Sequence, residues 1–280
     1  MRSVIFYFSQ IVTENTKKIA EKIAEGLRSN GNECDLVRFT KLKKDLELIK
    51  NFNFDNYNLI GIGVPVYYFH PPYNVYLILK DFPNLKNKKG FLFCTSGGNP
   101  GSTLYQMQVI LKEKGIIIID GNDRWRGWDV HQMYKNFGGY LPSSKGHPNE
   151  EELKQAVEFG KSLLKKALDP NVSEKTDFWK KQNESAKMWT YEYMQEWFPK
   201  LPGKFYEDRC TKCGLCAELC PMDKIVLDPY PKFLDIPCNR CYICELKCPE
   251  NAIECNWDKQ IEYLESLMNQ RQKKKKDSSN

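Results

Sequence analysis

Short apolar runs alternate with amphipathic stretches over the first 167 residues of the chain. The first run, RSVIFYF at residues 2–8, is rich in β-branched and aromatic residues, which favour a strand. The stretch that follows places apolar residues three and four positions apart, on one face of a helix: Ile19, Ala20, Ile23, Ala24 and Leu27. The pattern therefore predicts a strand, a polar loop, and a helix that begins near Asn15 and is closed by Gly31.

The same alternation continues along the chain and defines the expected architecture. Further strands are predicted at 33–39, 59–64, 90–94 and 116–120, and helices near 73–81, 102–114 and 150–167. The last helix has a clear start, because Asn149 is followed three residues later by Glu152, the spacing of a capping box. Strands that alternate with helices predict an α/β domain, a doubly wound parallel five-stranded sheet with right-handed crossovers.

A segment rich in large aromatic residues, 168–203, follows this domain. Its pattern predicts a long helix that Pro199 stops, with four bulky anchors: Trp179, Trp189, Tyr193 and Trp197. A helix with so much aromatic surface would not stay exposed to water. We therefore expect this linker to pack the first domain against whatever follows it.

Composition limits the class of protein. A chain of 280 residues fits two domains, and its 41% hydrophobic and 13% aromatic residues suffice for a buried core. No apolar run approaches the roughly 20 residues that a membrane span needs, and the first run is too short for a signal peptide. The sequence therefore predicts a cytoplasmic protein with no membrane span.

The net charge of +6 is concentrated near the carboxyl terminus. Arg271 and the four lysines at 273–276, less Asp277, contribute +4, which leaves +2 for everything before residue 271. A nearly balanced chain gives no reason to expect a nucleic-acid partner. Residues 257–280 are predicted to form a helix followed by a basic disordered tail.

Eight of the eleven cysteines lie in two matched blocks. CTKCGLCAELCP at 210–221 and CNRCYICELKCP at 238–249 both follow C-x-x-C-x-x-C-x-x-x-C-P, and each cysteine of the second block lies 28 residues after its counterpart. Three thiolates at this spacing on a turning loop can hold three corners of an iron–sulfur cube. The fourth cysteine is too far round the following helical turn to close the same cube.

The blocks resemble those of bacterial-type two-cluster ferredoxin domains over residues 204–256. In that family the fourth cysteine of each block ligates the other cluster. The resemblance implies two [4Fe–4S] clusters, one held by Cys210, Cys213, Cys216 and Cys248, the other by Cys238, Cys241, Cys244 and Cys220. It also implies a repeated fold with short strands at 225–227, 233–236 and 252–254, while Cys255 belongs to neither set and is expected to pack.

Two other uses of these cysteines are possible. Eight thiolates could hold two zinc ions, although structural zinc usually takes paired C-x-x-C units separated by a longer gap. Disulfides would need an oxidising compartment, which no other feature of the chain indicates. The tandem triple spacing favours iron–sulfur clusters over both.

Three unusual loops are expected at the carboxyl ends of the predicted strands, where an open α/β sheet binds its ligand. They are SQIVTENT, VPVYYFHPPY and TSGGNPGS, and through them residues 1–167 resemble flavodoxin-like domains. The resemblance implies a phosphate cradle in the first loop and a flavin ring held by the other two. No G-x-G-x-x-G follows the first strand, so the dinucleotide fingerprint is absent.

An FMN site in these loops would use several kinds of group. A helix that begins near Asn15 offers backbone N–H groups to a phosphate. The candidate residues are Ser9, Thr13, Asn15 and Thr16 for the phosphate, and Pro65, Val66, Tyr67, Tyr68, Phe69, Thr95, Ser96, Gly97, Gly98 and Asn99 for the ring. The first loop departs from the family pattern, because Glu14 stands where glycine is usual, so an empty or repurposed domain is the alternative.

Two further features could serve a substrate. His70 lies inside the second loop and could reach a flavin edge or deliver a proton. The aromatic and glycine-rich stretch 124–140 could cap a flavin or shape a pocket, or simply pack at the surface. Spacing alone assigns no catalytic residue.

With both domains taken together, the chain resembles the flavodoxin–ferredoxin fusion proteins of anaerobic bacteria and archaea. They imply an electron-transfer protein that passes low-potential electrons between its clusters and FMN, to or from a partner redox enzyme. One alternative is a flavin-dependent reductase of a small molecule, fed by its own ferredoxin domain. Another is a non-redox partner-binding module with structural clusters.

Overall fold

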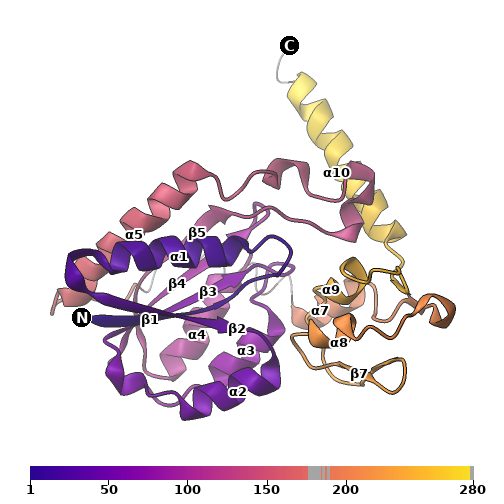
Figure 1. Ribbon diagram of the computed structural model, residues 1–280. Helices are drawn as coiled ribbons and strands as arrows, with labels where there is room; N and C mark the ends of the chain where they lie inside the picture. Colours follow the sequence, from indigo (N-terminus) through magenta and orange to yellow (C-terminus); the bar gives the residue numbers. More distant parts are fainter. Residues whose placement is uncertain (176–183, 185–186, 188–189, 278–280) are drawn as a thin grey trace.

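The computed structural model describes residues 1–175, 184, 187 and 190–277. Its larger part is a parallel five-stranded sheet in the order β2-β1-β3-β4-β5 (Figure 1). The strands are β1 (Arg2–Phe8), β2 (Glu33–Phe39), β3 (Leu59–Pro65), β4 (Lys89–Ser96) and β5 (Ile117–Arg126). This is the strand order of the flavodoxin-like fold. The predicted doubly wound sheet is therefore confirmed.

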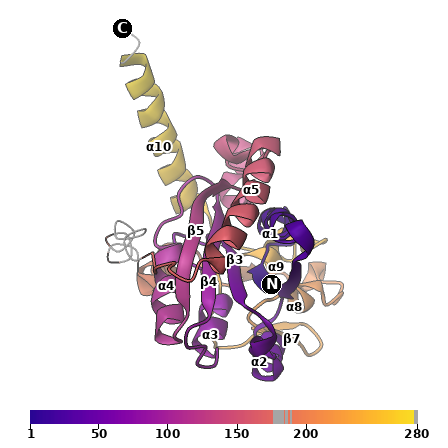
Figure 2. The ribbon, with the colours of Figure 1, turned by 90° about the vertical axis from the view of Figure 1, so that its left-hand side faces the viewer.

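Helices cover both faces of the sheet (Figures 1 and 2). One face is covered by α1 (Asn15–Leu27) and α5 (Glu150–Leu168), the other by α2 (Leu42–Asn51), α3 (Tyr73–Lys80) and α4 (Thr103–Glu113). The described residues also form five 3₁₀ turns: Ser29–Gly31, Phe54–Asn56, Gln132–Phe137, Pro142–Ser144 and Glu207–Arg209. The predicted capping box is present, because the N–H of Glu152 donates to Asn149 Oδ1 at 2.9 Å and the N–H of Asn149 donates to Glu152 Oε2 at 2.8 Å.

The structure differs from the predicted elements of this domain at two places. Helix α2 was not predicted, since half of its residues are charged and it buries only Asp45 and Ile49. Strand β5 runs six residues past the predicted end at Asp120, with irregular register against β4. The extension carries the chain to the carboxyl edge of the sheet, where the 124–140 stretch begins.

The carboxyl-terminal unit is small and contains two short antiparallel strand pairs. Strand β6 (Lys204–Phe205) pairs with β9 (Ile253–Glu254), and β7 (Ile225–Leu227) pairs with β8 (Pro231–Phe233). Helices α8 (Leu215–Glu218) and α9 (Ile243–Leu246) each contain the third cysteine of a block, Cys216 and Cys244. The strand at 225–227 is as predicted, whereas its partner lies two residues earlier than predicted.

The linker is not one continuous helix over its described part. Helix α7 spans Tyr191–Trp197, and Thr190 before it is extended, with φ −74° and ψ 158°. The Thr190 side chain accepts a hydrogen bond from the N–H of Tyr193, so it starts a new helix rather than continuing an earlier one. The predicted anchors Trp179 and Trp189 lie outside the described residues.

The last helix, α10 (Asp258–Asp277), projects from the molecule (Figures 1 and 2). It includes residues 271–277, which the sequence analysis assigned to a disordered tail. Gln, Arg and Lys favour helices, and neither Gly nor Pro interrupts this segment, so the backbone continues without a break. Among the helices of the described residues, none combines the length and the apolar character that a membrane-spanning segment requires.

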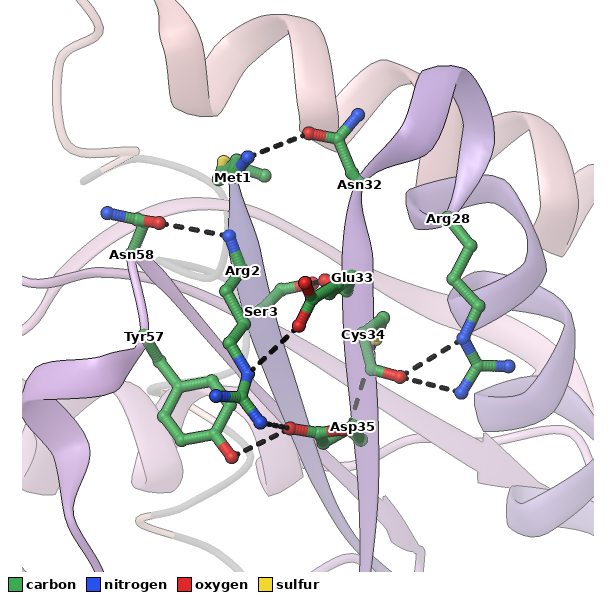
Figure 3. Close-up of polar contacts among 10 residues, drawn as sticks. All are labelled: Met1, Arg2, Ser3, Arg28, Asn32, Glu33, Cys34, Asp35, Tyr57 and Asn58. Carbon is green, nitrogen blue, oxygen red and sulfur yellow. Dashed lines mark hydrogen bonds and ion pairs between the residues drawn. The ribbon is translucent and has the colours of Figure 1, made fainter.

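Polar contacts fix the amino-terminal edge of the sheet (Figure 3). Asp35 on β2 accepts from Arg2 Nη2 at 2.9 Å and from the hydroxyl of Tyr57 at 2.7 Å. The Tyr57 hydroxyl, and then Arg2, lower the pKa of the Asp35 carboxyl. Because these groups lie on β1, on β2 and in the turn before β3, they hold the first residue of β1 between β2 and β3.

The carboxyl-terminal unit docks at the opposite edge of the sheet, beside the ends of the strands (Figure 1). Asn239 Oδ1 accepts from the N–H of Asn74 at 2.9 Å, and Asn239 Nδ2 donates to Asn74 Oδ1 at 2.8 Å. Both side chains are buried. Lys41 forms an ion pair with Asp223 at 3.2 Å, and the N–H of Leu42 donates to the carbonyl of Pro221. Both polar atoms of the Asn239 amide are thus paired with Asn74, while Asn74 Nδ2 has no partner among the described residues. A buried amide that is paired only in this position makes the docking specific.

A buried carboxyl lies next to this docking surface. Asp45 is fully buried, and its Oδ2 accepts from the N–H of Thr40 at 2.6 Å. Its Oδ1 has no hydrogen-bond partner among the described residues. Burial raises the pKa of Asp45 from 3.8 to about 6.

We expect Asp45 to make the folded state less stable as the pH rises from about 4 to about 6. In that range the unfolded chain ionises at this position while the folded chain stays protonated, so the folded state holds the extra proton. The loss is at most roughly 3 kcal/mol at neutral pH, since each pKa unit corresponds to about 1.4 kcal/mol. Urea unfolding of the wild type and of Asp45→Asn across this pH range measures it. Parallel pH curves for the two proteins would contradict the assignment.

Candidate functional site

A cavity of about 550 Å³ opens at the carboxyl ends of the strands. It is lined by every FMN candidate residue except Ser9: Thr13, Asn15, Thr16, Pro65, Val66, Tyr67, Tyr68, Phe69, Thr95, Ser96, Gly97, Gly98 and Asn99. The three loops singled out in the sequence therefore converge on one space. A volume of this size lies within the range of small-ligand sites.

Ser9 has a different role from the other candidates. Its hydroxyl accepts a hydrogen bond from the N–H of Lys17 at 3.2 Å, which satisfies one of the free N–H groups in the first turn of α1. Asn15 donates from Nδ2 to Thr13 Oγ1 at 2.9 Å and to the carbonyl of Trp128 at 3.0 Å. Its Oδ1 is buried without a partner among the described residues, although the side chain lines the cavity.

Glu14, the residue that departs from the family pattern, points away from the cavity. Its carboxylate pairs with Lys17 at 2.9 Å and Arg38 at 2.8 Å, and it is not among the lining residues. The hydrogen bond from Lys17 is the main cause that lowers the pKa of Glu14. Its backbone is left-handed, with φ 50°, the conformation that a glycine would adopt more easily at this position. The negative charge of Glu14 is thus neutralised outside the cavity.

The second loop makes a tight two-residue turn. The N–H and carbonyl groups of Tyr67 and His70 bond reciprocally at 2.9 and 3.0 Å, and the residues between them, Tyr68 and Phe69, have φ 52° and 72°. Such turns normally use Asn or Gly, so two aromatic residues here store backbone strain. Gly101 allows the turn to sit close, because a Cβ there would lie 2.3 Å from Phe69 Cβ.

Two histidines differ from what the sequence suggests. His70 is buried, its Nδ1 lies 2.6 Å from Gln106 Nε2, and it is not among the residues that line the cavity. His131, which spacing did not single out, does line it. Burial lowers the pKa of His131 to about 3, so this ring is neutral at physiological pH. Its Nδ1 accepts from the N–H of Met133, which leaves Nε2 as the protonated atom, 3.1 Å from the Tyr68 hydroxyl.

The 124–140 stretch forms part of the cavity wall rather than an isolated surface loop. Trp128, Asp129, Met133, Tyr134 and Phe137 all line the cavity. It is held in place by hydrogen bonds within the same region, such as that from the N–H of Asp129 to Ser144 Oγ at 2.9 Å. Its density of aromatic residues and glycines was the signal that marked it in the sequence.

The eight block cysteines surround two further, smaller cavities. Cys210, Cys213, Cys216 and Cys248 line one, and Cys220, Cys238, Cys241 and Cys244 line the other. Each cavity therefore brings together three cysteines of one block and the fourth of its sister. This is the grouping that the ferredoxin resemblance implies.

The backbone repeats around these cavities with the same 28-residue offset as the cysteines. Three pairs of residues with positive φ are related by it: Lys212 and Arg240, Gly214 and Tyr242, Asp223 and Asn251. Hydrogen bonds to sulfur repeat as well, from the N–H of Lys224 to Cys220 Sγ at 3.4 Å and from the N–H of Ala252 to Cys248 Sγ at 3.2 Å. The two halves thus present equivalent ligand loops despite different side chains.

The chemistry of the cysteine sites suits clusters better than single ions. No group of three or more Cys, His, Asp or Glu side chains in the described part of the chain could hold one metal ion. A four-iron cube spaces its thiolates more widely than a single zinc ion does. Burial raises the pKa of the Cys238 and Cys244 thiols, and N–H groups that point at sulfur, as from Arg240 to Cys238 Sγ at 3.3 Å, stabilise the thiolate form that a metal requires.

The large cavity and one cysteine site meet at Cys241, which lines both. Tyr68 makes a second connection, because its hydroxyl donates to the carbonyl of Arg240 at 2.8 Å, within the loop between Cys238 and Cys241. The Tyr68 ring also packs against Phe198, with centroids 3.7 Å apart. The loop after β3, which carries Tyr68, and the loop between Cys238 and Cys241 are thus in direct contact.

Comparison with known proteins agrees with the assignment of both domains, the flavodoxin-like one and the one that carries the cysteine blocks. A flavodoxin-domain family model matches residues 4–116, and a 4Fe-4S binding-domain model matches residues 204–223. The uncharacterized protein MJ0298 of Methanocaldococcus jannaschii is 34% identical over 167 residues, which make up 59% of this chain and 99% of that protein.

Two solved structures are similar to the first part of the chain. A flavodoxin from the domain Archaea has 19% identity and a TM-score of 0.39, covering 60% of this chain and 99% of the other. The rubredoxin oxygen:oxidoreductase of Desulfovibrio gigas has 18% identity and a TM-score of 0.39, covering 60% and 37%. From its relative, its domains and its strand order, the chain belongs to the same family as MJ0298 and is a fusion of a flavodoxin-like domain with a 4Fe-4S ferredoxin-type domain, an iron–sulfur flavoprotein of electron transfer.

Proposed function

We propose that the protein carries electrons between a partner redox protein and FMN through two [4Fe–4S] clusters. The observation that supports this most directly is that Cys241 lines both the second cysteine cavity and the large cavity. A cluster exchanges one electron at a time, whereas a flavin can exchange one or two. The pairing would therefore convert between one-electron and two-electron chemistry.

The exposure of the cysteines suggests the order of transfer. Cys213 is exposed, while Cys210, Cys216 and Cys248 are half-buried. In the other set Cys220 and Cys244 are buried. A partner would therefore reach the cluster of the first set, and the second cluster would pass electrons to or from FMN.

The residues of the large cavity fit FMN in three respects. The amino terminus of α1, with Thr13, Asn15 and Thr16, would hold the phosphate, and the buried unpaired Asn15 Oδ1 offers an acceptor for a ligand hydroxyl. Tyr67 and Tyr68 offer flat surfaces to the ring. Glu14, which would oppose a phosphate, is neutralised by Lys17 and Arg38.

Replacing Cys220 by Ser should remove the cluster of the second cysteine set and leave that of the first. We expect iron to fall from about eight to about four per chain in anaerobically purified protein. Cys255→Ser is the matched control, since Cys255 lines neither cysteine cavity, and it should keep all the iron. Iron analysis with electron paramagnetic resonance of the reduced protein checks both. Zinc in place of iron in the wild type would contradict the cluster assignment.

Replacing Glu14 by Gln should strengthen FMN binding. The change frees Lys17 and Arg38 from a partly exposed ion pair, so their charge can act on the phosphate, a gain of about 1 kcal/mol or roughly fivefold in Kd. Fluorescence titration of the flavin-free protein with FMN measures it. Riboflavin, which lacks the phosphate, should bind both proteins equally, and an equal gain for riboflavin would point to a different cause.

Replacing Tyr68 by Phe should slow electron transfer from clusters to flavin while FMN remains bound. The ring is kept, but the hydrogen bond to the Arg240 carbonyl is lost, about 1 kcal/mol of contact between the two loops. Stopped-flow bleaching of the flavin after cluster reduction reports the rate. Tyr206→Phe, which loses a hydroxyl contact to Glu254 on β9, is the control and should transfer at the wild-type rate. Equal rates in all three proteins would show that the Tyr68 contact is not part of the route.

A further inference from the structure

The large cavity has a second wall that none of the three flavin-type loops provides. It consists of Met133 and Phe137 in the 3₁₀ turn Gln132–Phe137, Trp197 on α7, and Leu264, Leu267 and Met268 on α10. All six side chains are apolar or aromatic and only half-buried. Methionine and aromatic surfaces of this kind suit an apolar ligand of variable shape. FMN held by the three loops would leave this wall to another molecule.

The cavity also contains a carboxyl group without a cationic partner. Asp129 Oδ2 accepts from the Tyr134 hydroxyl at 2.9 Å, and among the described residues Asp129 forms no ion pair. It lies against the third loop, since a Cβ on Gly97 would be 2.9 Å from Asp129 Oδ2. Burial raises the pKa of this carboxyl, partly offset by Tyr134, which favours its protonated form. Burial favours the neutral form of Tyr67, Tyr68 and His131 nearby, and Tyr68 and His131 are hydrogen-bonded to each other. Arg126 is a further charged residue of the cavity lining.

The walls of the cavity restrict what can exchange electrons there. Its lining includes Cys241 from the ferredoxin-type unit, Met194 from α7 and Tyr263 from α10, elements that surround the flavin-type loops. A protein partner would have a freer approach to the first cysteine set, in which Cys213 is exposed. If electrons enter there, the molecule that removes them from the large cavity must be small.

We propose that the large cavity is a substrate site in which a small, planar, apolar molecule with a conjugated carbonyl group is reduced by two electrons. The apolar wall would bind the body of the molecule, and Asp129, held by Tyr134, would donate a proton to it. The inference rests on the proposed function, because the electrons come through the clusters and FMN.

The reaction balances with two electrons and two protons. The carbon–carbon π bond of the conjugated system breaks and two C–H bonds form. A flavin held by loop residues such as Thr13, Tyr67 and Gly97 would supply two electrons and a proton to one carbon, and Asp129 would donate a proton to its neighbour. Water would return a proton to Asp129 and another to the flavin, and an external one-electron donor protein would supply the two electrons through the cysteine sites.

Binding can be tested without turnover. Equilibrium dialysis of the oxidised holoprotein with benzylacetone and with cyclohexanone, saturated analogues that cannot be reduced in this way, measures occupancy of the site. Leu267→Arg puts a charge into the apolar wall and should weaken binding by at least about tenfold. Ser266→Arg, one residue earlier on the exposed side of α10, is the matched control and should bind like the wild type. Wild-type protein that binds neither analogue would overturn the proposal.

Turnover tests the role of Asp129. With reduced methyl viologen as donor, the wild type should convert benzylideneacetone and cyclohexenone to their saturated ketones. Asp129→Asn should slow product formation roughly a hundredfold, the usual contribution of a general acid, while the clusters reduce FMN at the wild-type rate in the same sample. Unchanged product formation in Asp129→Asn would exclude it as the proton donor.

The two proposals can fail separately. If FMN is bound and reduced by the clusters but neither enone is converted, the substrate site is wrong and the electron carrier stands. If the visible spectrum shows no flavin, or the clusters do not reduce it, the proposed function fails, and the substrate site fails with it.

Discussion

The arrangement of this protein depends on one set of buried polar contacts, which join the loop after β3 and the start of α3 to the loop that carries the second block of cysteines. Asn239 bonds to Asn74 through both polar atoms of its side-chain amide, whereas Asn74 Nδ2 has no partner among the described residues. The Tyr68 hydroxyl donates to the carbonyl of Arg240. An unpaired buried amide or hydroxyl costs free energy, so these groups favour a single relative position of the two units. Tunnelling between redox centres falls steeply with distance, and a fixed position therefore matters more here than in a simple two-domain protein.

The same constraint explains the strained turn at Tyr68 and Phe69. A glycine in either place would relax the backbone, but it would remove a ring that packs against the hydrophobic cluster containing Phe198, Tyr242 and Trp257. The surrounding contacts hold the strain in place. Strain of this kind is typical of residues whose position matters for binding or catalysis.

Much of the molecule could be predicted from the sequence, because the strongest signals are local. Apolar strands and the Asn149 cap lie in short windows, and the cysteine spacing indicated which thiols the fold would gather. What could not be predicted depends on tertiary contact. Ser9 carries the hydroxyl expected of a phosphate loop, yet it binds the N–H of Lys17. His131 stands alone in the sequence and enters the cavity only because β5 extends and its following stretch folds back. Helix α2 escaped notice because it buries so few of its residues.

The interleaving of the two cysteine blocks has a consequence for biosynthesis. Under the proposed ligand sets, the first cube lacks its last thiolate until Cys248 has left the ribosome, and the second needs Cys220 from a segment made much earlier. Neither half of the repeat can mature alone. Iron and sulfide must therefore be inserted after translation of almost the whole carboxyl-terminal unit, and a chain truncated between the blocks would be left with no complete set of four ligands for either metal centre.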